Sequence, residues 1–277
     1  MSEVETGLYL GKIPHAKAGS GDLDVIMFPG ADNLLGWGGE TTCRLMFYKF
    51  LPERYREKCT LHVLGYQRDL PENATTETMA RDYGEAVKKE IRPGIIFGGS
   101  FGGFLAIPFA SLYPELTKKL LLANAAYTVS ESGKQWALRL IELAGKGEFY
   151  KFEKEINYLY NTLFFRGLMN FYTWKGRRKD KNKPYSYPIS TFITAFKDVL
   201  ARPLERKEHL HKIKASTLVF GGTKDLVFSE DIFRETAELI PNAELKLVKG
   251  GHMAAVEKPF AFRKVFLRVL DDLFEES

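Results

Sequence analysis

The sequence predicts an α/β protein in which a mostly parallel sheet is flanked by helices and interrupted by a helical insertion. Short apolar runs alternate with amphipathic stretches along most of the chain, and this alternation is typical of parallel sheets. Between residues 126 and 205 no convincing strand pattern occurs, and the alternation resumes afterwards. The length of 277 residues allows one large domain with an insertion or two smaller domains.

Each predicted strand is a short apolar run bounded by turn-forming residues. The run at 24–29 stops at Gly30, and the run at 95–98 begins directly after Pro93 and Gly94. The predicted strands are 8–17, 24–29, 60–66, 95–98, 119–123, 217–221 and 244–248.

The predicted helices lie between these strands and show a period of about 3.6 residues. In the segment 75–91, for example, Met79, Tyr83 and Val87 recur on one face. The other helices predicted around the sheet are 41–55, 102–114, 229–240 and 259–274. The interrupting segment is helical in pattern, aromatic and basic. We therefore expect a core made of residues 1–125 and 206–277, with residues 126–205 as the insertion.

Positive charge is concentrated in the insertion. The whole chain has a net charge of +5, but the segment 126–207 contains 16 Lys or Arg and 8 Asp or Glu. The strongest cluster is at 175–183. A solvated loop explains such a cluster, and a patch for nucleic acid or an anionic membrane is the alternative. Because no nucleic-acid motif accompanies the charge, we expect no nucleic-acid partner.

The compartment is predicted from what the sequence lacks. No apolar run approaches the roughly 18 residues of a membrane-spanning helix, and the first five residues do not resemble a signal peptide. Cys43 and Cys59 form no CxxC or Cys/His cluster, so we expect two reduced, buried thiols and no metal site. The protein is therefore expected to be cytoplasmic, without stable membrane insertion.

The segment Gly98-Gly99-Ser100-Phe101-Gly102 matches the pattern G-x-S-x-G. Such a pattern is weak alone, but here a strand is predicted directly before it and a helix directly after it. This strand–turn–helix context is that of a nucleophile elbow, where small neighbours allow a sharp turn that exposes the serine hydroxyl. The sequence therefore predicts that Ser100 is a nucleophile.

A serine hydroxyl needs a base to accept its proton, and the base needs a carboxylate to orient it. Of the five histidines, His252 follows a late strand in a glycine-rich loop, where a side chain reaches the carboxyl edge of the sheet. His62 lies inside a strand pattern, and His209 and His211 lie in a polar segment where we expect them to be solvated. His252 is therefore the predicted base.

Two aspartates compete for the role of the acid. Asp225 lies in the turn after the strand at 217–221, whereas Asp231 falls in the first turn of a helix, where acids are favoured by the helix dipole alone. We therefore predict Asp225. The oxyanion of the intermediate needs two donors, and we predict the backbone N–H groups of Phe101 and Ala31, with Gly30 leaving room for substrate.

With these three motifs in order, the chain resembles the α/β-hydrolase superfamily, in particular its capped serine esterases and lipases. The resemblance covers almost the whole chain and implies an α/β-hydrolase fold in which residues 126–205 form a cap. It also implies substrate contacts by Gly30, Phe101 and Met253 and no metal or organic cofactor. One departure is that members often carry His-Gly where this chain has Pro29-Gly30. The matching segments are Gly98–Gly102, Gly222–Asp225, Gly250–Met253 and Glu257–Pro259.

The resemblance implies hydrolysis of a small apolar carboxylic ester, with a short- to medium-chain acyl group, by a monomer or homodimer. The same triad also serves C–C bond hydrolases, thioesterases, small-substrate peptidases and cofactor-free haloperoxidases. A non-catalytic binding module on the same fold is a further alternative.

Overall fold

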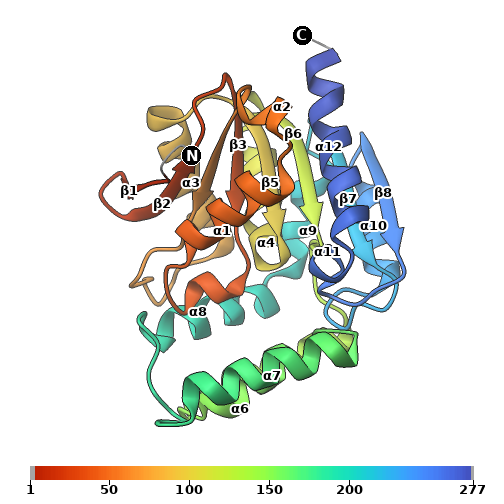
Figure 1. The fold of residues 1–277 in the computed structure, drawn as a ribbon. Coiled ribbons are helices and arrows are strands. Elements are labelled where there is room, and N and C mark those ends of the chain that lie inside the picture. Colours follow the sequence, from red (N-terminus) through yellow and green to blue (C-terminus); the bar gives the residue numbers. More distant parts are fainter. Residues whose placement is uncertain (1–3, 276–277) are drawn as a thin grey trace.

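The computed structural model describes residues 4–275 and arranges them around one eight-stranded sheet. The strand order is β1-β2-β4-β3-β5-β6-β7-β8. The strands from β4 to β8 run parallel, while β2 is antiparallel to both β1 and β4. A mostly parallel sheet with helices on both sides is the architecture that the sequence predicts (Figure 1).

Six of the predicted strands are confirmed within two residues at each end. They are β3 (Leu23–Phe28), β4 (Cys59–Leu64), β5 (Gly94–Gly99), β6 (Thr117–Ala123), β7 (Ser216–Gly222) and β8 (Ala243–Val248).

The single opening strand predicted at 8–17 is wrong. The structure has an antiparallel hairpin of β1 (Glu5–Tyr9) and β2 (Ile13–Ala18) in its place. The chain reverses at Leu10 and Gly11, which both adopt positive φ, at 51° and 69°. A leucine in this conformation is uncommon, so the sequence gives little sign of the turn.

Helices cover both faces of the sheet, because alternate residues of each strand point to opposite sides. Val25 and Met27 of β3 pack under α1 and α12, whereas Ile26 and Phe28 pack under α3 and α4. The helices around the sheet are α1 (Gly39–Leu45), α2 (Glu53–Arg56), α3 (Thr76–Glu90), α4 (Gly103–Leu112), α10 (Glu230–Leu239), α11 (Ala254–Glu257) and α12 (Pro259–Glu275).

The continuous helix predicted at 41–55 is divided. Helix α1 passes into a π-helical turn, η2 (Met46–Phe50), and the chain is extended at Leu51 and Pro52 before α2 begins. A proline restricts its preceding residue to extended conformations, which accounts for the break.

Between β6 and β7 the chain is helical, as predicted. Helices α6, α7 and α8 lie below the carboxyl ends of the strands in Figure 1, α5 packs on α6 and α8, and α9 packs on α4. Their bounds are α5 (Glu131–Gly145), α6 (Phe149–Asn157), α7 (Leu163–Arg177), α8 (Ile189–Ala201) and α9 (Pro203–Leu210). Within residues 4–275, no helix has the length and apolar character needed to span a bilayer.

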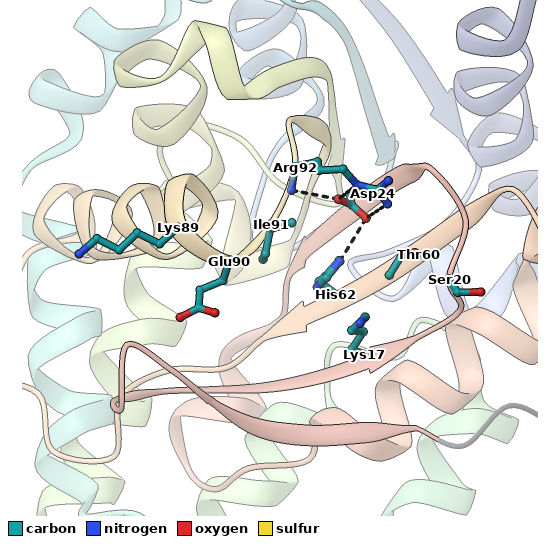
Figure 2. Close-up of a pocket in the computed structure, with 9 residues that line it drawn as sticks. All are labelled: Lys17, Ser20, Asp24, Thr60, His62, Lys89, Glu90, Ile91 and Arg92. Atoms are coloured by element: carbon teal, nitrogen blue, oxygen red, sulfur yellow. Dashed lines mark hydrogen bonds and ion pairs between the residues drawn. The ribbon is translucent and has the colours of Figure 1, made fainter.

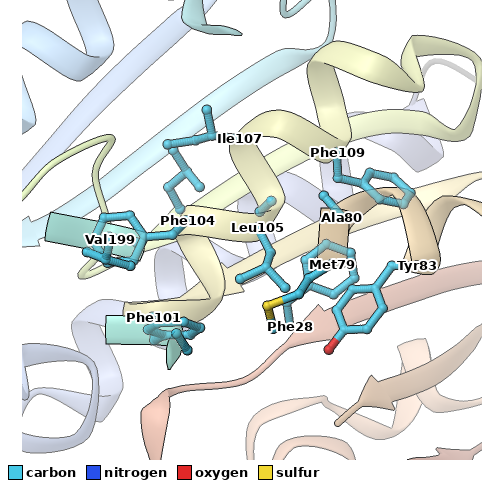
Figure 3. Packing of buried hydrophobic residues seen from close by; sticks show 14 of the residues in the cluster. Phe28, Met79, Ala80, Tyr83, Phe101, Phe104, Leu105, Ile107, Phe109 and Val199 are labelled. Carbon is cyan, nitrogen blue, oxygen red and sulfur yellow. The ribbon is translucent and has the colours of Figure 1, made fainter. Parts of the chain in front are cut away.

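The larger apolar core lies between the sheet and the layer of α3 and α4. Phe28 of β3 packs against Tyr83 of α3 and Phe109 of α4, at ring-centroid distances of 4.9 and 5.3 Å. At the other end of this core, Phe101 and Phe104 lie close to Val199 of α8 (Figure 3). Residues that pack α4 onto the sheet therefore also contact α8, in the helical segment between β6 and β7.

Candidate active site

Ser100 lies at a sharp turn between β5 and α4. Its φ of 49° is in the left-handed region, which costs a non-glycine residue about 1–3 kcal/mol. The turn continues as a single 3-10 turn, η3 (Ser100–Gly102), and α4 follows without a gap. The serine hydroxyl is thus placed at the amino end of a helix, where the helix dipole favours negative charge.

The glycines of the turn are required by close packing. A Cβ on Gly102 would lie 1.9 Å from the carbonyl oxygen of Phe28, and one on Gly98 would lie 2.7 Å from the Cβ of Ala106. Side chains at these positions would push the turn away from β3 and α4. The G-x-S-x-G pattern is therefore explained by space as well as by the bend itself.

The structure brings Ser100, His252 and Asp225 together. The Ser100 Oγ lies 2.8 Å from His252 Nε2, and His252 Nδ1 lies 3.1 and 3.0 Å from the two carboxylate oxygens of Asp225. A carboxylate only accepts hydrogen bonds, so Nδ1 carries a proton and donates to Asp225. The Nε2 of the neutral ring is then an acceptor for the Ser100 hydroxyl.

Asp225 and His252 are both buried and firmly held. The Oδ1 of Asp225 accepts hydrogen bonds from the backbone N–H groups of Val227 and Phe228, at 2.8 and 3.1 Å. The Phe228 ring packs against the imidazole at a centroid distance of 5.6 Å. These contacts restrict the imidazole to the orientation that faces Ser100.

The loop after β3 approaches Ser100 from the other side. A Cβ on Gly30 would lie 3.9 Å from the Cβ of Ser100, and Ala31 begins the 3-10 turn η1 (Ala31–Leu34). The loop is anchored by Tyr66, which donates a hydrogen bond to the Pro29 carbonyl oxygen and packs edge-on against Phe101 at 5.5 Å. Tyr66 is a positioning residue that was not predicted from the sequence, because it follows β4 and is distant from this loop along the chain.

A small apolar cavity of about 30 Å³ adjoins Ser100 and His252. Ala31 and Phe101, the predicted donors to the oxyanion, line it, whereas Gly30 and Met253, for which substrate contacts were predicted, are not among the described residues that do so. Apart from Ala31, Ser100, Phe101 and His252, the residues of its wall were not predicted from the sequence. The bulky ones, contributed by the elbow region, by α5 and α8 and by the loop after β7, are Phe101, Phe104, Trp136, Phe196, Val199 and Phe228.

The remaining histidines lie away from this cavity. His211 is exposed as predicted, but the prediction for His209 is wrong because it is buried. Its Nδ1 lies 3.0 Å from Ser111 Oγ, and its Nε2 lies 3.5 Å from a carboxylate oxygen of Glu77. Burial lowers the pKa of His209, so the ring serves as a packed polar contact. Cys43 and Cys59 are free and buried, as predicted.

A second, larger cavity of about 440 Å³ lies at the amino ends of the strands, opposite Ser100 (Figure 2). His62 in its wall has its Nε2 3.3 Å from Asp24 Oδ1 and its Nδ1 2.9 Å from the Tyr9 hydroxyl. Arg92 donates to Asp24 through its backbone N–H and its guanidinium, at 3.0 and 3.1 Å. Burial alone would raise the pKa of Asp24, but the hydrogen bonds from His62 and Arg92 lower it overall.

The basic cluster at 175–183 has two parts. Arg177 is buried and forms an ion pair of 2.7 Å with Glu153, and it also donates to the carbonyl oxygen of Lys183 at 2.8 Å. Arg178 and Lys179 are exposed. Arg177 is therefore a structural residue, and the solvated charge belongs to its neighbours.

The fold agrees with comparisons to known proteins. A family model described as the alpha/beta hydrolase fold matches residues 36–259. The poly(3-hydroxyalkanoate) depolymerase of Ectopseudomonas oleovorans is 26% identical over 265 residues, which cover 93% of this chain and 78% of that protein.

Similar solved structures include an enol-lactonase from Burkholderia xenovorans, with a TM-score of 0.76 at 16% identity, covering 96% of this chain and 100% of that one. An esterase from Exiguobacterium antarcticum has a TM-score of 0.71 at 19% identity and covers 94% and 95% of the two chains. At such identities the structures show a shared fold. Because the family model matches most of the sequence, the chain belongs to the α/β-hydrolase family.

Proposed function

We propose that this protein is a serine hydrolase that cleaves carboxylic esters with short acyl groups. The observation that carries this proposal is the continuous hydrogen-bonded chain from Ser100 through His252 to Asp225, beside an apolar cavity. In this proposal Ser100 is the nucleophile, His252 is the base and Asp225 orients His252.

In the first half of the reaction, the Ser100 Oγ attacks the ester carbonyl carbon while its proton passes to His252 Nε2. Asp225 stabilises the imidazolium that forms, because its carboxylate already accepts the Nδ1 proton. The carbonyl oxygen becomes an oxyanion, for which the N–H groups of Phe101 and Ala31 are the proposed donors. The intermediate then breaks the C–O bond, and His252 gives its proton to the departing alkoxide, leaving an acyl group on Ser100.

In the second half, water attacks the acyl carbon. His252 accepts a proton from this water, and a second tetrahedral intermediate collapses to release the carboxylic acid. His252 returns the proton to Ser100 Oγ, so that each turnover consumes one ester and one water and restores the starting protonation.

The size of the cavity supports a short acyl group. Its volume of about 30 Å³ is roughly twice the space that a single water molecule needs, and Trp136 and Phe196 are among its bulky wall residues. An acetyl group fits such a space, whereas a medium-length acyl chain needs these side chains to move. Few polar atoms line the cavity, which favours an uncharged acyl group.

We also propose that residues 126–205 act as the cap over this site. Trp136 of α5 and Val199 of α8 form part of the cavity wall, so the helical segment determines which substrates fit. The similarity to a poly(3-hydroxyalkanoate) depolymerase supports an ester as the bond that is cleaved.

The proposal is tested with p-nitrophenyl esters of increasing acyl length and with a fluorophosphonate probe. We expect the acetate ester to be turned over fastest and the probe to label Ser100. His252→Gln should abolish both activities, while His211→Gln, at an exposed histidine, should leave both unchanged. If the wild-type protein neither reacts with the probe nor hydrolyses any ester of the series, the proposal is wrong.

A further inference from the structure

Helix α7 has its hydrophobic residues on the outside. Leu163 and Phe164 are 81% and 74% exposed. With 3.6 residues per turn, the exposed apolar side chains of this helix fall within one half of its circumference. Lys175 is the single charged residue in that half. The exposed apolar side chains are Leu163, Phe164, Leu168, Phe171, Tyr172 and Trp174, and we refer to them as the outer face of α7.

The inner half of α7 carries polar side chains that contact α6, beside the partly buried Phe165 and Met169. The Asn157 side-chain amide on α6 donates to Asn170 at 3.2 Å and to Thr173 at 3.0 Å. One turn further, Arg177 pairs with Glu153 of α6. A helix of a soluble protein normally buries its apolar stripe and exposes its polar one. In α7 the polar contacts to α6 fix the opposite orientation.

The outer face is directed away from the rest of the protein. In Figure 1, α7 lies at the lower edge of the molecule, below the sheet and α8, and its packing is mainly on α6. Exposed apolar side chains are usually scattered singly, and a contiguous patch marks an interaction site. The outer face is therefore a candidate surface for a partner.

Charge on and beside α7 indicates the partner. Residues 163–183 contain seven Lys or Arg and one Asp, a net charge of +6, and α7 itself contains no Asp or Glu. Lys175, Arg178, Lys179 and Lys181 are exposed at the carboxyl-terminal end of the outer face. The partner thus needs an apolar interior beside a negatively charged surface.

We propose that the outer face of α7 binds the surface of an anionic lipid bilayer. A helix with Trp, Phe and Leu on one face and nearby basic residues lies in the plane of the interface, with its apolar side chains among the upper parts of the acyl chains. Tyr172 and Trp174 are residue types that favour this interface, and the exposed lysines would meet anionic headgroups. Binding of this kind is peripheral and reversible.

Two other partners fit the same surface less well. A second copy of the chain would bring an identical cationic segment and no carboxylate on α7 to pair with it. A nucleic acid would be contacted through phosphates by basic residues, but the outer face offers it only Lys175 among six large apolar side chains. Neither partner explains why the aromatic residues are on the outside.

The test is co-sedimentation with vesicles of phosphatidylcholine alone and of equal parts phosphatidylcholine and phosphatidylglycerol. We expect binding to the anionic vesicles to be at least about tenfold stronger and to weaken with added salt. Phe171→Ser/Trp174→Ser and Arg178→Gln/Lys179→Gln should each weaken it about tenfold or more. Because these side chains are exposed, the variants are expected to fold.

Matched controls are available at other exposed positions. Leu8→Ser/Phe260→Ser removes two exposed apolar side chains from β1 and α12, and Lys134→Gln/Lys212→Gln removes two exposed cations. Both should bind vesicles like the wild type. Trp174 emission should shift to shorter wavelength on anionic vesicles, and Trp174→Phe should abolish this shift. Ser100→Ala should bind as well as the wild type, so this inference stands or fails separately from the proposed function.

Four results would overturn the proposal. The first is equal sedimentation with both kinds of vesicle or with neither. The second is binding that the α7 variants do not weaken more than the controls do. The third is a dimer in light scattering that Phe171→Ser/Trp174→Ser dissociates, because the outer face would then bind a second copy. Binding of RNA with the affinity of the anionic vesicles, lost in the same variants, would likewise count against a lipid partner.

Discussion

Two histidines in this protein each lie between a carboxylate and a hydroxyl group, at opposite ends of the sheet. His252 has Asp225 on one side and Ser100 on the other, while His62 lies between Asp24 and Tyr9. Both rings are buried, and all the contacts are within 3.3 Å. The arrangement of three groups therefore does not by itself make a catalytic site.

The first difference is which groups donate hydrogen bonds to each carboxylate. Asp24 accepts a charged hydrogen bond from the Arg92 guanidinium and also lies within hydrogen-bond distance of His62. Asp225 accepts from the uncharged N–H groups of Val227 and Phe228. A carboxylate already paired with a guanidinium has less stabilisation to offer an imidazolium. The charge of Asp225 is thus available to His252.

The second difference is the hydroxyl group. Ser100 sits on a strained turn at the amino end of α4 and beside an apolar cavity. The Tyr9 phenol is buried, and burial raises its pKa well above the ordinary value, with a further contribution from the charge of Glu90. The phenol therefore stays protonated. Position at the elbow, and not contact with a histidine, is what singles out Ser100.

The largest expected effect comes from removing each hydroxyl in turn. Ser100→Ala should lower kcat for an acetate ester by about 10⁵-fold or more, because no other group can form the acyl intermediate. Tyr9→Phe should leave kcat within about twofold, since it only removes a hydrogen bond worth about 1 kcal/mol to folding. Steady-state kinetics on both purified variants checks this. A comparable loss of activity in Tyr9→Phe would show that the hydrogen-bonded groups around His62 affect those around His252.

The next effect comes from the carboxylates. Asp225→Asn should lower kcat by about 10⁴-fold, because the amide no longer favours the tautomer that accepts the Ser100 proton. Asp24→Asn should keep kcat but weaken the hydrogen bonds from Arg92, with a loss of about 2 kcal/mol in the free energy of unfolding. For a chain of this length that loss lowers Tm by roughly 4–8 °C.

Thermal unfolding and kinetics measured on the same samples separate the two carboxylates. The comparison fails if Asp24→Asn loses activity at a temperature where it is fully folded, or if Asp225→Asn retains the wild-type kcat.

A smaller effect concerns the wall of the cavity at Ser100. Trp136→Ala should enlarge this cavity. It should raise kcat/KM for the hexanoate ester relative to the acetate ester by about tenfold or more. The reason is that each added methylene in an apolar pocket changes the free energy of transition-state binding by about 1 kcal/mol or more. A matched control is Leu138→Ala, an exposed residue of the same helix. If the ratio of the two esters is the same in both variants, Trp136 does not limit the acyl group.

The sequence allowed the elbow to be predicted because its determinants are local. An apolar strand, small residues and a helix surround Ser100 within a few positions, and the chain order of the fold then selects Asp225 and His252. The strands were predicted for the same reason, since each is a continuous apolar run. The hairpin turn escaped prediction because Leu10 gives no sign of its positive φ.

Contacts between distant segments could not be predicted. Tyr9, Asp24 and His62 come from β1, β3 and β4, and their meeting depends on the order β1-β2-β4-β3 in the sheet. Likewise, the periodicity of α7 defines two faces but not which one is turned outward. That orientation follows from the contacts of Asn170 and Arg177 with α6, which exist only in the folded chain.

The smallest effect is the dependence of stability on pH at Asp24. The folded protein holds the pKa of this carboxyl below its ordinary value, whereas in the unfolded chain it is about 3.9. The unfolded chain therefore takes up the proton first as pH falls. The stabilisation is fully present above about pH 4 and is lost as the pH drops through the folded-state pKa. Asp24→Asn lacks this carboxyl, so its stability should fall less in acid.

The measurement is the Tm of the wild type and of Asp24→Asn at a series of pH values from neutral to about 3. We expect the difference between them to be constant at neutral pH and to shrink in acid. Asp22→Asn, at an exposed carboxylate that also contacts Arg92, is the matched control and should show a much smaller difference throughout. A difference that stays constant down to the lowest pH would mean that the Asp24 pKa is not lowered by folding. The charge of Asp24 beside His62 and Arg92 would then add nothing to the free energy of unfolding.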